Sequence, residues 1–447
     1  MMNQRCTYRL VPLVLALVGL LLLVKRPATA APSTPDTPPS APNWTTPTLV
    51  SLAGLSSADA KVSAAPDGQT VMVAFNQQIS GSSVNNDPYY VLSTDNGATW
   101  TPLPTAIHNS PVTAANSLFV DIAYDGSGAA HAVWREGLGL AYSNNSLYTW
   151  PTNNTNNPPL TLSAPTAPGA SDPLIVTTGT VVDIIWSEGT NSGNPNIRHA
   201  RSADGGATFP INQVINSTST NDSRVPALAV DPHDVNRIYA VWEQQLMDGS
   251  TNTVYFAQGT VTGGAIVWTT PIQISPGNDR QPEIVANAQG LHIVYTHKEP
   301  TLGDQQLVYY IRCNSSNCTQ VSNWSSPVNA SGQFVSVNSS DPYDIVSSMV
   351  DYNGCRYVYY HGTDITLVQD TERIWGVNSC DGWQAGGNER LTDPANVRAI
   401  NPDVATGPGG WIYLVYVRAD TLNRQIYVMR AQEDPTFRAL LPVIHRR

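Results

Sequence analysis

Charged side chains recur directly after the most apolar stretches of this 447-residue chain. Glu136, Glu188 and Glu243 each follow such a stretch. Two carboxylates about 5 to 10 Å apart across a glycosidic bond are the machinery of glycoside hydrolysis. Arginine, in turn, is suited to binding a carboxylate through two parallel hydrogen bonds. The candidate ligand pocket therefore comprises Arg224, Arg280, Arg418, Glu136, Glu188, Glu243, His297 and His361.

The alternative interpretation of this set is a solvated rim of mixed charge, because repetition of the chain explains the spacing equally well. The histidines show no metal-ligand spacing, and the chain contains neither a phosphate-binding glycine loop nor a Gly-x-Ser-x-Gly motif. The sequence therefore predicts no metal and no cofactor. It assigns no catalytic residue. Tyrosines could act as nucleophiles, but those such as Tyr295 and Tyr360 occupy apolar positions that recur in the repeats, which is typical of core residues.

An internal repeat would position these residues. The segment Asn43–Ser51 returns as Val267–Ser275, and one aromatic position recurs every 50 to 59 residues. Each repeat contains four short stretches rich in Val, Ile and aromatic residues, with turn residues between them. This pattern predicts an all-β, seven-bladed β-propeller with four-stranded antiparallel blades. The recurring aromatics are Trp44, Trp100, Trp150, Phe209, Trp268, Trp324 and Trp383.

The order of the strands predicts how the ring closes. The chain begins with an outer strand, Trp44–Leu52, and its last repeat, Ile400–Met429, supplies only three strands. We therefore expect the N-terminal strand to complete the last blade, which removes two open sheet edges. The tail 438–444 is the rival for that place, but its proline is unfavourable in a strand ladder.

Two repeats carry a sharper motif between their third and fourth strands. Its residues are Ser93, Asp95, Gly97, Thr99 and Trp100 in one copy, and Ser202, Asp204, Gly206, Thr208 and Phe209 in the other. The motif resembles the Asp-box (BNR repeat) of the sialidase superfamily. Its Asp accepts hydrogen bonds from backbone N–H groups of its own turn, its Gly takes a positive φ angle and its aromatic residue packs into the blade. A structural role is therefore expected for Asp95 and Asp204, not a catalytic one.

The resemblance implies what a sialidase-type site would need. Such enzymes bind the substrate carboxylate with three arginines and use an aspartate acid and a tyrosine nucleophile assisted by a glutamate. The segment Arg224–Leu228 resembles the family's Arg-Ile-Pro segment, Arg280 occupies the equivalent place one repeat later, and Arg418 is the candidate third arginine. Sialidases have six blades, so a six-bladed ring is the alternative fold.

Three functions follow from these observations. The favoured one is an exported glycan- or protein-recognition or scaffold module. The alternatives are a sialidase-type glycoside hydrolase, acting as an exo-α-sialidase would, and another propeller enzyme such as a polysaccharide lyase. Whether the protein is an enzyme stays open, because one fold hosts many functions.

The N-terminus predicts export. Residues 1–30 combine basic residues, an apolar run of 15 residues and a small-x-small cleavage site, which is typical of a signal peptide, and an uncleaved anchor is the alternative. We expect a Pro/Ser/Thr-rich linker over residues 31–42, the propeller over 43–432 and a tail over 433–447. Without residues 1–30 the chain carries 19 basic against 34 acidic residues, which argues against nucleic acid as a partner. We expect a secreted or cell-surface monomer with no membrane span after signal removal.

The cysteines fit that location. Four remain after signal removal, and an even number in an exported chain indicates disulfides. Four cysteines allow three pairings. We favour Cys313 with Cys318, around a turn that lacks the Asp-box, and Cys355 with Cys380, across a hairpin of one blade.

Overall fold

The computed structural model describes residues 42–432 apart from short segments between strands. The gaps are residues 82–84, 111–115, 154, 164–168, 190–193, 217–220, 246–250, 300–304, 333–334, 337–346, 353, 365–370, 381–382, 384–388, 393–396 and 420–422. The predicted signal peptide, nearly all of the linker and the C-terminal tail lie outside the described residues. All described residues belong to one compact unit, Pro39–Arg447.

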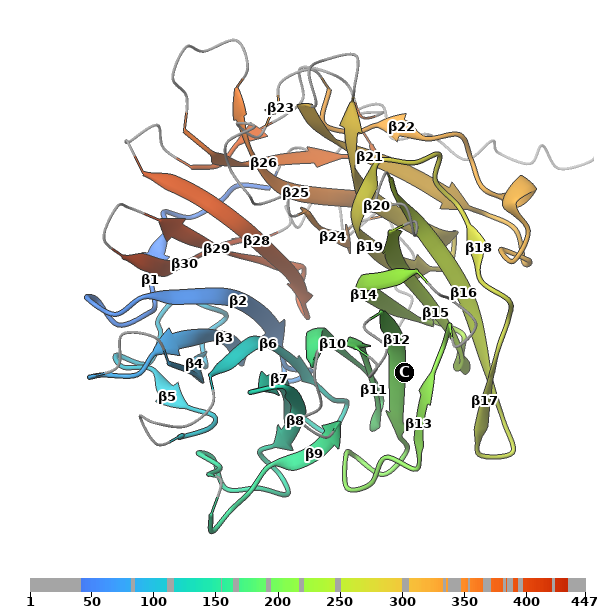
Figure 1. Cartoon of the computed structure of the whole chain (residues 1–447). Coiled ribbons are helices and arrows are strands. Elements are labelled where there is room, and N and C mark those ends of the chain that lie inside the picture. The colour runs from blue at the N-terminus through green and yellow to red at the C-terminus, as the bar shows by residue number, and fades with distance from the viewer. Residues whose placement is uncertain are drawn as a thin grey trace, which may run out of the picture. The chain divides into compact units, whose positions relative to one another are not determined.

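The described chain folds into seven antiparallel sheets arranged in a ring, which is a seven-bladed β-propeller (Figure 1). The prediction of seven blades is therefore confirmed. Blade 1 contains β2 (Ser57–Ala64), β3 (Val71–Gln78), β4 (Asn86–Ser93) and β5 (Thr105–Ala106). Blade 2 contains β6 (Ser117–Tyr124), β7 (Ala130–Glu136), β8 (Gly139–Asn144) and β9 (Leu160–Ser163). Blade 3 contains β10 (Ala170–Thr178), β11 (Val181–Gly189), β12 (Pro195–Ser202) and β13 (Ile211–Val214).

The remaining blades repeat this order with small additions. Blade 4 contains β14 (Asp222–Asp231), β15 (Asp234–Gln245), β16 (Asn252–Thr262) and β17 (Ala265–Trp268), with β18 (Ile272–Gln273) also paired to β16. Blade 5 contains β19 (Asp279–Asn287), β20 (Gly290–Glu299), β21 (Gln305–Cys313) and β22 (Val328–Asn329), with the short 3-10 helix η2 (Val321–Asn323) before β22. Blade 6 contains β24 (Ser347–Tyr352), β25 (Cys355–Asp364), β26 (Arg373–Asn378) and β27 (Glu389–Arg390), with β23 (Val335–Ser336) also paired to β25.

Blade 7 closes the ring as the sequence predicted. It contains β28 (Arg398–Gly407), β29 (Trp411–Ala419) and β30 (Arg424–Gln432), and its fourth strand is β1 (Thr48–Leu49) from the start of the described chain. Thr48 pairs with Val428, and the backbone N–H of Val50 donates to the carbonyl of Ile426 at 2.9 Å. The first and last strands of the described chain are thus joined within one sheet.

The core consists of apolar clusters between neighbouring blades. Seven such clusters lie among the described residues, one at each junction of the ring. The aromatic residue near the end of each second strand is buried in them, because its ring covers the adjacent sheet. These residues are Phe75, Trp134, Trp186, Trp242, Tyr295, Tyr360 and Tyr416.

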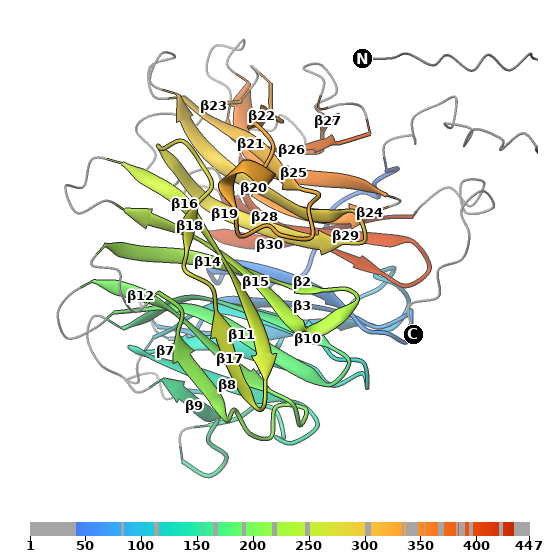
Figure 2. The ribbon, with the colours of Figure 1, turned by 90° about the vertical axis from the view of Figure 1, so that its right-hand side faces the viewer.

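The first strand of each blade faces the ring axis (Figure 1), and the strands run from one face of the ring to the other (Figure 2). In six blades this first strand contains a β-bulge whose central residue has a positive φ, between 46° and 56°. A bulge bends its strand and re-aims the side chains that follow it. The six residues are Asp59, Phe119, Asp172, Val225, Gln281 and Asn401. Four of them are followed by proline, at Pro173, Pro226, Pro282 and Pro402.

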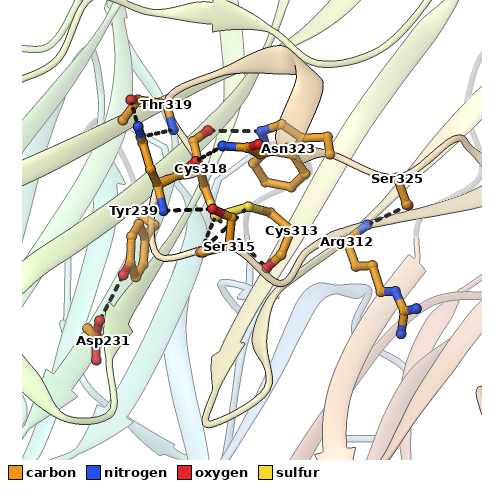
Figure 3. Close-up of a disulfide and its surroundings, with 11 residues drawn as sticks. Asp231, Tyr239, Arg312, Cys313, Ser315, Cys318, Thr319, Asn323 and Ser325 are labelled. Atoms are coloured by element: carbon orange, nitrogen blue, oxygen red, sulfur yellow. Dashed lines mark hydrogen bonds between the residues drawn. A yellow bond between two sulfur atoms is a disulfide. The ribbon is translucent and has the colours of Figure 1, made fainter. Parts of the chain in front are cut away.

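Both favoured disulfides are present, Cys313–Cys318 and Cys355–Cys380. Figure 3 shows the first of them in the turn after β21, beside the hydrogen bond from Tyr239 to Asp231 of blade 4. The backbone carbonyl of Cys318 accepts a hydrogen bond from the indole of Trp324 at 2.9 Å. The disulfide therefore holds a turn that, in blades 1 and 3, is held by an aspartate.

Candidate functional site

A pocket of about 240 Å³ lies on the ring axis, where the first strands of the blades begin. The six bulge residues form its rim: Asp59, Phe119, Asp172, Val225, Gln281 and Asn401. Four of the side chains two residues further along the first strands form its floor: Lys61, Leu174, Ala227 and Glu283. Positive φ is rarely adopted by residues such as Val and Phe, and such backbone conformations gather at binding sites. The axial pocket is therefore the candidate functional site.

One lysine stands among carboxylates at the floor of this pocket. Lys61 of blade 1 forms a 3.1 Å ion pair with Asp403 of blade 7, and their side chains are 32% and 14% exposed. Burial disfavours the charge on Lys61, but Asp403, Asp121 and Glu283 outweigh that effect and raise the pKa of Lys61. Asp403 thus binds the cation directly, while the charges of Asp121 and Glu283 favour its protonated form.

The acids near Lys61 lose part of their tendency to ionise. Burial raises the pKa of Glu283 to about 7 and that of Asp121 to about 6, although Lys61 acts in the opposite direction on both. Burial also raises the pKa values of Asp59 and Asp172 at the rim. The pocket therefore contains carboxyl groups that can donate or accept a hydrogen bond near neutral pH.

Other first-strand side chains, outside the pocket lining, bind the blades together. Asp121 accepts a 2.8 Å hydrogen bond from the backbone N–H of Ile175 in the next blade. Asp403 accepts one of 2.9 Å from Val62, again in the next blade of the ring. Ser348 of blade 6 does the same for Val404 at 3.2 Å. Asp121 and Asp403 thus have a structural role, whereas Glu283 lines the pocket itself.

Two of the sequence-predicted residues support the rim from behind. The carboxylate of Glu243 accepts a hydrogen bond from the N–H of Gln281 at 3.1 Å, and the buried His361 accepts one from the N–H of Asn401 at 3.4 Å. Both bonds run from one blade to the bulge of the next. Glu243 and His361 are therefore placed to position the rim, and neither is in the pocket lining.

Three others interact with side chains outside the axial pocket, including Ser163 of blade 2, which donates a hydrogen bond to Glu188 of blade 3. Glu136 accepts hydrogen bonds from Ser117 at 2.6 Å and from the indole of Trp134 at 3.0 Å. Glu188 pairs with Arg198 at 2.9 Å, and burial raises its pKa. His297 is 2.7 Å from Asp279, and that hydrogen bond raises its pKa. The structure does not bring these three groups into the axial pocket.

The three arginines occupy different surroundings. Arg224 pairs with Asp222 at 2.8 Å, and its side chain is 55% exposed. Arg280 is exposed on β19, directly before the rim residue Gln281. Arg418 lies over the ring of Tyr427 at 5.4 Å and lines a separate pocket between blades 6 and 7. Arg224 and Arg280 thus stand next to the axial rim, and Arg418 stands apart from both.

The two sequence motifs form equivalent turns. Ser93 donates to Asp95 at 2.8 Å, and Asp95 accepts from the backbone N–H and hydroxyl of Thr99 at 2.8 and 2.6 Å. Ser202, Asp204 and Thr208 repeat this pattern. The hydrogen bonds from Thr99 and Ser93 lower the pKa of Asp95 to about 2. In this geometry every aspartate oxygen serves its own turn.

The inner ring of Lys61, Asp121, Glu283 and Asp403 is absent from the sequence-predicted set. Each of these residues pairs with the residue immediately before the buried aromatic of its own second strand. The recurring aromatic is visible in the sequence, but the bulge in the first strand hides which residue of that strand pairs next to it. The Val225-Pro226 and Gln281-Pro282 pairs that follow the two arginines are copies of the bulge, which also occurs without an arginine at Asp172-Pro173 and Asn401-Pro402.

No group of three or more His, Cys, Asp or Glu side chains suited to a metal ion occurs among the described residues. Within the same residues, no helix has the length and apolar character needed to cross a membrane.

Comparison with known proteins gives matches at the level of the fold. Neither protein-family models nor curated proteins match this chain. A protein of unknown function from Dyadobacter fermentans aligns with 87% of this chain and 98% of its own, at a TM-score of 0.50 and 11% identity. Trypanosoma rangeli sialidase in complex with sialic acid aligns with 84% of this chain and 54% of its own, at a TM-score of 0.44 and 12% identity. A variant of an α-L-arabinofuranosidase from Fusarium graminearum, bound to an iminosugar inhibitor, aligns with 72% of this chain and 95% of its own, at a TM-score of 0.45 and 13% identity.

Proposed function

We propose that this protein is an exported propeller that recognises a carbohydrate in its axial pocket. The observation that carries the proposal is the composition of the rim. It combines carboxylates at Asp59 and Asp172, amides at Gln281 and Asn401 and an aromatic ring at Phe119. A sugar ring presents hydroxyl groups at its edge and C–H groups on its face, so it needs polar partners and an apolar surface together.

The charge of the pocket narrows the class of sugar. Among the lining residues, the carboxyl groups of Asp59, Asp172 and Glu283 outnumber the single cation, Lys61. Lys61 is itself paired with Asp403. A neutral sugar or an amino sugar suits these surroundings, whereas a sugar carboxylate would meet like charge.

Sialidase-type hydrolysis is less well supported. It would need three arginines around one substrate carboxylate, and Arg418 lines a different pocket from the one beside Arg224 and Arg280. Export, by contrast, is supported by two disulfides, which persist in oxidising compartments. A secreted or cell-surface location for a monomer remains part of the proposal.

The test is glycan-array binding by the purified protein, followed by calorimetry and by turnover assays on fluorogenic glycosides that include a sialoside. We expect binding of a neutral or amino glycan and at least a tenfold weaker affinity for Asp172→Asn. Asparagine preserves the shape and tolerates the positive φ of 50° at this position. Arg418→Ala, outside the pocket, serves as the control. Sialoside turnover that is abolished by Arg224→Ala would overturn the proposal in favour of a sialidase.

A further inference from the structure

The Asp95 and Asp204 turns seal the grooves between neighbouring blades on the face opposite the axial pocket. Arg430 of blade 7 donates to the carbonyls of Asp95 and Asn96 at 3.3 and 2.7 Å. In blade 3, Gly206 packs so closely that a side chain there would overlap the hydroxyl of Tyr142 in blade 2. In blades 1 and 3, the aspartate turn therefore packs against the preceding blade and fills the groove between the two.

Blade 2 has a different turn at the same place. There the amide oxygen of Asn144 accepts from the backbone N–H groups of Ser146 and Leu147 at 3.1 and 2.8 Å. Between this turn and blade 1 lies a groove of about 820 Å³. The groove contacts the turn after β2, whereas the axial pocket contacts the bulge near the start of β2. The two cavities thus lie at opposite ends of the same strand.

The lining of this groove has the chemistry of a saccharide site. Its described lining residues include four aromatic rings, at Tyr90, Tyr124, Tyr148 and Trp150, and contain no Lys, Arg or His. Trp150 is fixed by a 2.9 Å hydrogen bond to Ser143 and by an edge contact with Tyr90. The rings offer apolar faces to the C–H groups of a sugar, and the absence of a cation disfavours an anionic ligand.

Polar groups surround these rings. The lining also contains the hydroxyls of Ser127, Ser146 and Thr149 and the amide of Asn145. Asp67 is held by hydrogen bonds from the N–H groups of Gln69 and Thr70 at 2.8 Å, and the bonds from Thr70 and Gln69 outweigh its slight burial and lower its pKa. An ionised carboxylate and several hydroxyls can pair with sugar hydroxyl groups in fixed directions.

The groove between blades 4 and 5 provides an internal comparison. It lies at the equivalent place, beside the disulfide turn, but has a volume of about 340 Å³. Its lining contains His233 and Arg237, and its one aromatic ring, Tyr239, donates to Asp231 at 2.8 Å. Blades 2 and 5 both lack the aspartate turn and both leave a groove, and of these two grooves that of blade 2 contains the larger number of aromatic rings.

We propose that the groove between blades 1 and 2 is a second binding site, which takes a neutral oligosaccharide along its aromatic rings. Its size, its four rings and its lack of cationic side chains carry this assignment. The groove shares no lining residue with the axial pocket, so the proposal of a second site does not depend on the proposed axial function. A propeller with saccharide sites on both faces would gain avidity for a polymer that engages both.

The test uses calorimetry of the purified protein with cellohexaose, xylohexaose, mannohexaose, maltohexaose and chitohexaose, and with hyaluronate and polygalacturonate as anionic probes. We expect binding of at least one neutral hexasaccharide and a loss of about tenfold in affinity for Tyr148→Ala. Tyr148 is half-buried in the turn, so the melting temperature should stay close to that of the wild type. His233→Ala, in the equivalent groove of blades 4 and 5, is the matched control and should bind as the wild type does.

Three outcomes would overturn the second site. The first is no binding of any neutral probe, and the second is binding of the anionic probes alone. The third is binding that Asp172→Asn abolishes while Tyr148→Ala leaves it intact, which would place all saccharide recognition in the axial pocket. Conversely, binding that is sensitive to Tyr148→Ala and insensitive to Asp172→Asn would support the groove even if the proposed axial function failed.

Discussion

Lys61 of the first blade and Asp403 of the last blade form a 3.1 Å ion pair across the junction where the ring closes. The second oxygen of Asp403 accepts the backbone N–H of Val62 at 2.9 Å. The junction between blades 7 and 1 is therefore held both by the outer strand β1 and by this pair at the axis. The same lysine offsets the charge of Asp121 and Glu283, so closure of the ring and the electrostatics of the pocket depend on one side chain.

Replacement of that lysine tests the relationship. Lys61→Met keeps the length of the side chain but leaves the surrounding carboxylates without a cation. We expect a loss of about 1 to 3 kcal/mol in the free energy of unfolding at pH 8, because the pair is only partly buried. The loss should be smaller at pH 5, since the acids are then partly protonated. Guanidinium chloride unfolding at the two pH values measures both effects.

The matched control is Lys298→Met, which removes the same charge from an exposed position on β20. It should change the free energy of unfolding little at either pH. An equal loss for Lys61→Met at pH 5 and pH 8 would show that the lysine acts through packing alone.

Glu283 gives the sharpest dependence on pH. Burial raises its pKa to about 7 from an ordinary value of 4.5, so the folded state keeps a proton that the unfolded chain has already lost. Stability contributed by this group is complete below pH 4.5 and is lost as the pH rises to about 7. Glu283→Gln cannot ionise, so it should be more stable than the wild type by about 1 to 3 kcal/mol at pH 8. At pH 4 the two proteins should be alike.

Thermal and denaturant unfolding between pH 4 and pH 8 measures this difference. Asp234→Asn, at an exposed position at the start of β15, should give a profile parallel to that of the wild type. A Glu283→Gln variant that is less stable than the wild type at pH 8 would mean that the attraction between Glu283 and Lys61 exceeds the penalty of burial.

Much of the fold could be predicted from the sequence because large aromatic side chains recur at the same position of each repeat. Residues such as Trp134, Trp186 and Trp242 recur at one place in each blade and are completely buried. The closing strand was predictable for a related reason, since the last repeat lacks one strand and the chain begins with one. Both inferences depend on burial and on the number of strands, and a bulge within a strand changes neither.

The candidate site was harder to predict because side chains alternate along a strand. Glu243 follows its buried aromatic by one residue, whereas Glu136 and Glu188 follow theirs by two. A shift of one residue reverses the face, so Glu243 supports the rim while Glu136 and Glu188 bond to side chains outside the pocket. The bulge in the first strands conceals the inner ring for the same reason. It adds a residue to the strand, and the period-2 pattern then fails between Asp59 and Lys61.

The aspartate turn of blade 3 should contribute stability rather than binding. Asp204→Ala removes two hydrogen bonds from Thr208 and one from Ser202, which also anchors the N–H of Gly206. We expect the free energy of unfolding to fall by about 1 to 2 kcal/mol, because water can replace part of these exposed bonds. Saccharide affinity should stay within twofold of the wild type.

Denaturant unfolding and calorimetry on the same preparation separate the two effects. Ala203→Ser, at the neighbouring exposed position of the same turn, is the control for the substitution itself. Loss of saccharide binding with unchanged stability would contradict a purely structural role for Asp204.

The two disulfides should differ in what they contribute. Cys355 and Cys380 are 25 residues apart in the chain, whereas Cys313 and Cys318 are only 5 apart. A cross-link restricts the unfolded chain more when it closes a longer loop, which gives about 3.5 kcal/mol for the first bond and about 2 kcal/mol for the second. Double serine variants of each pair, compared by guanidinium chloride unfolding, measure this difference. A larger loss for Cys313→Ser with Cys318→Ser would contradict the loop-length argument. It would show that the short bond acts mainly in the folded state, by holding the turn that an aspartate holds in blades 1 and 3.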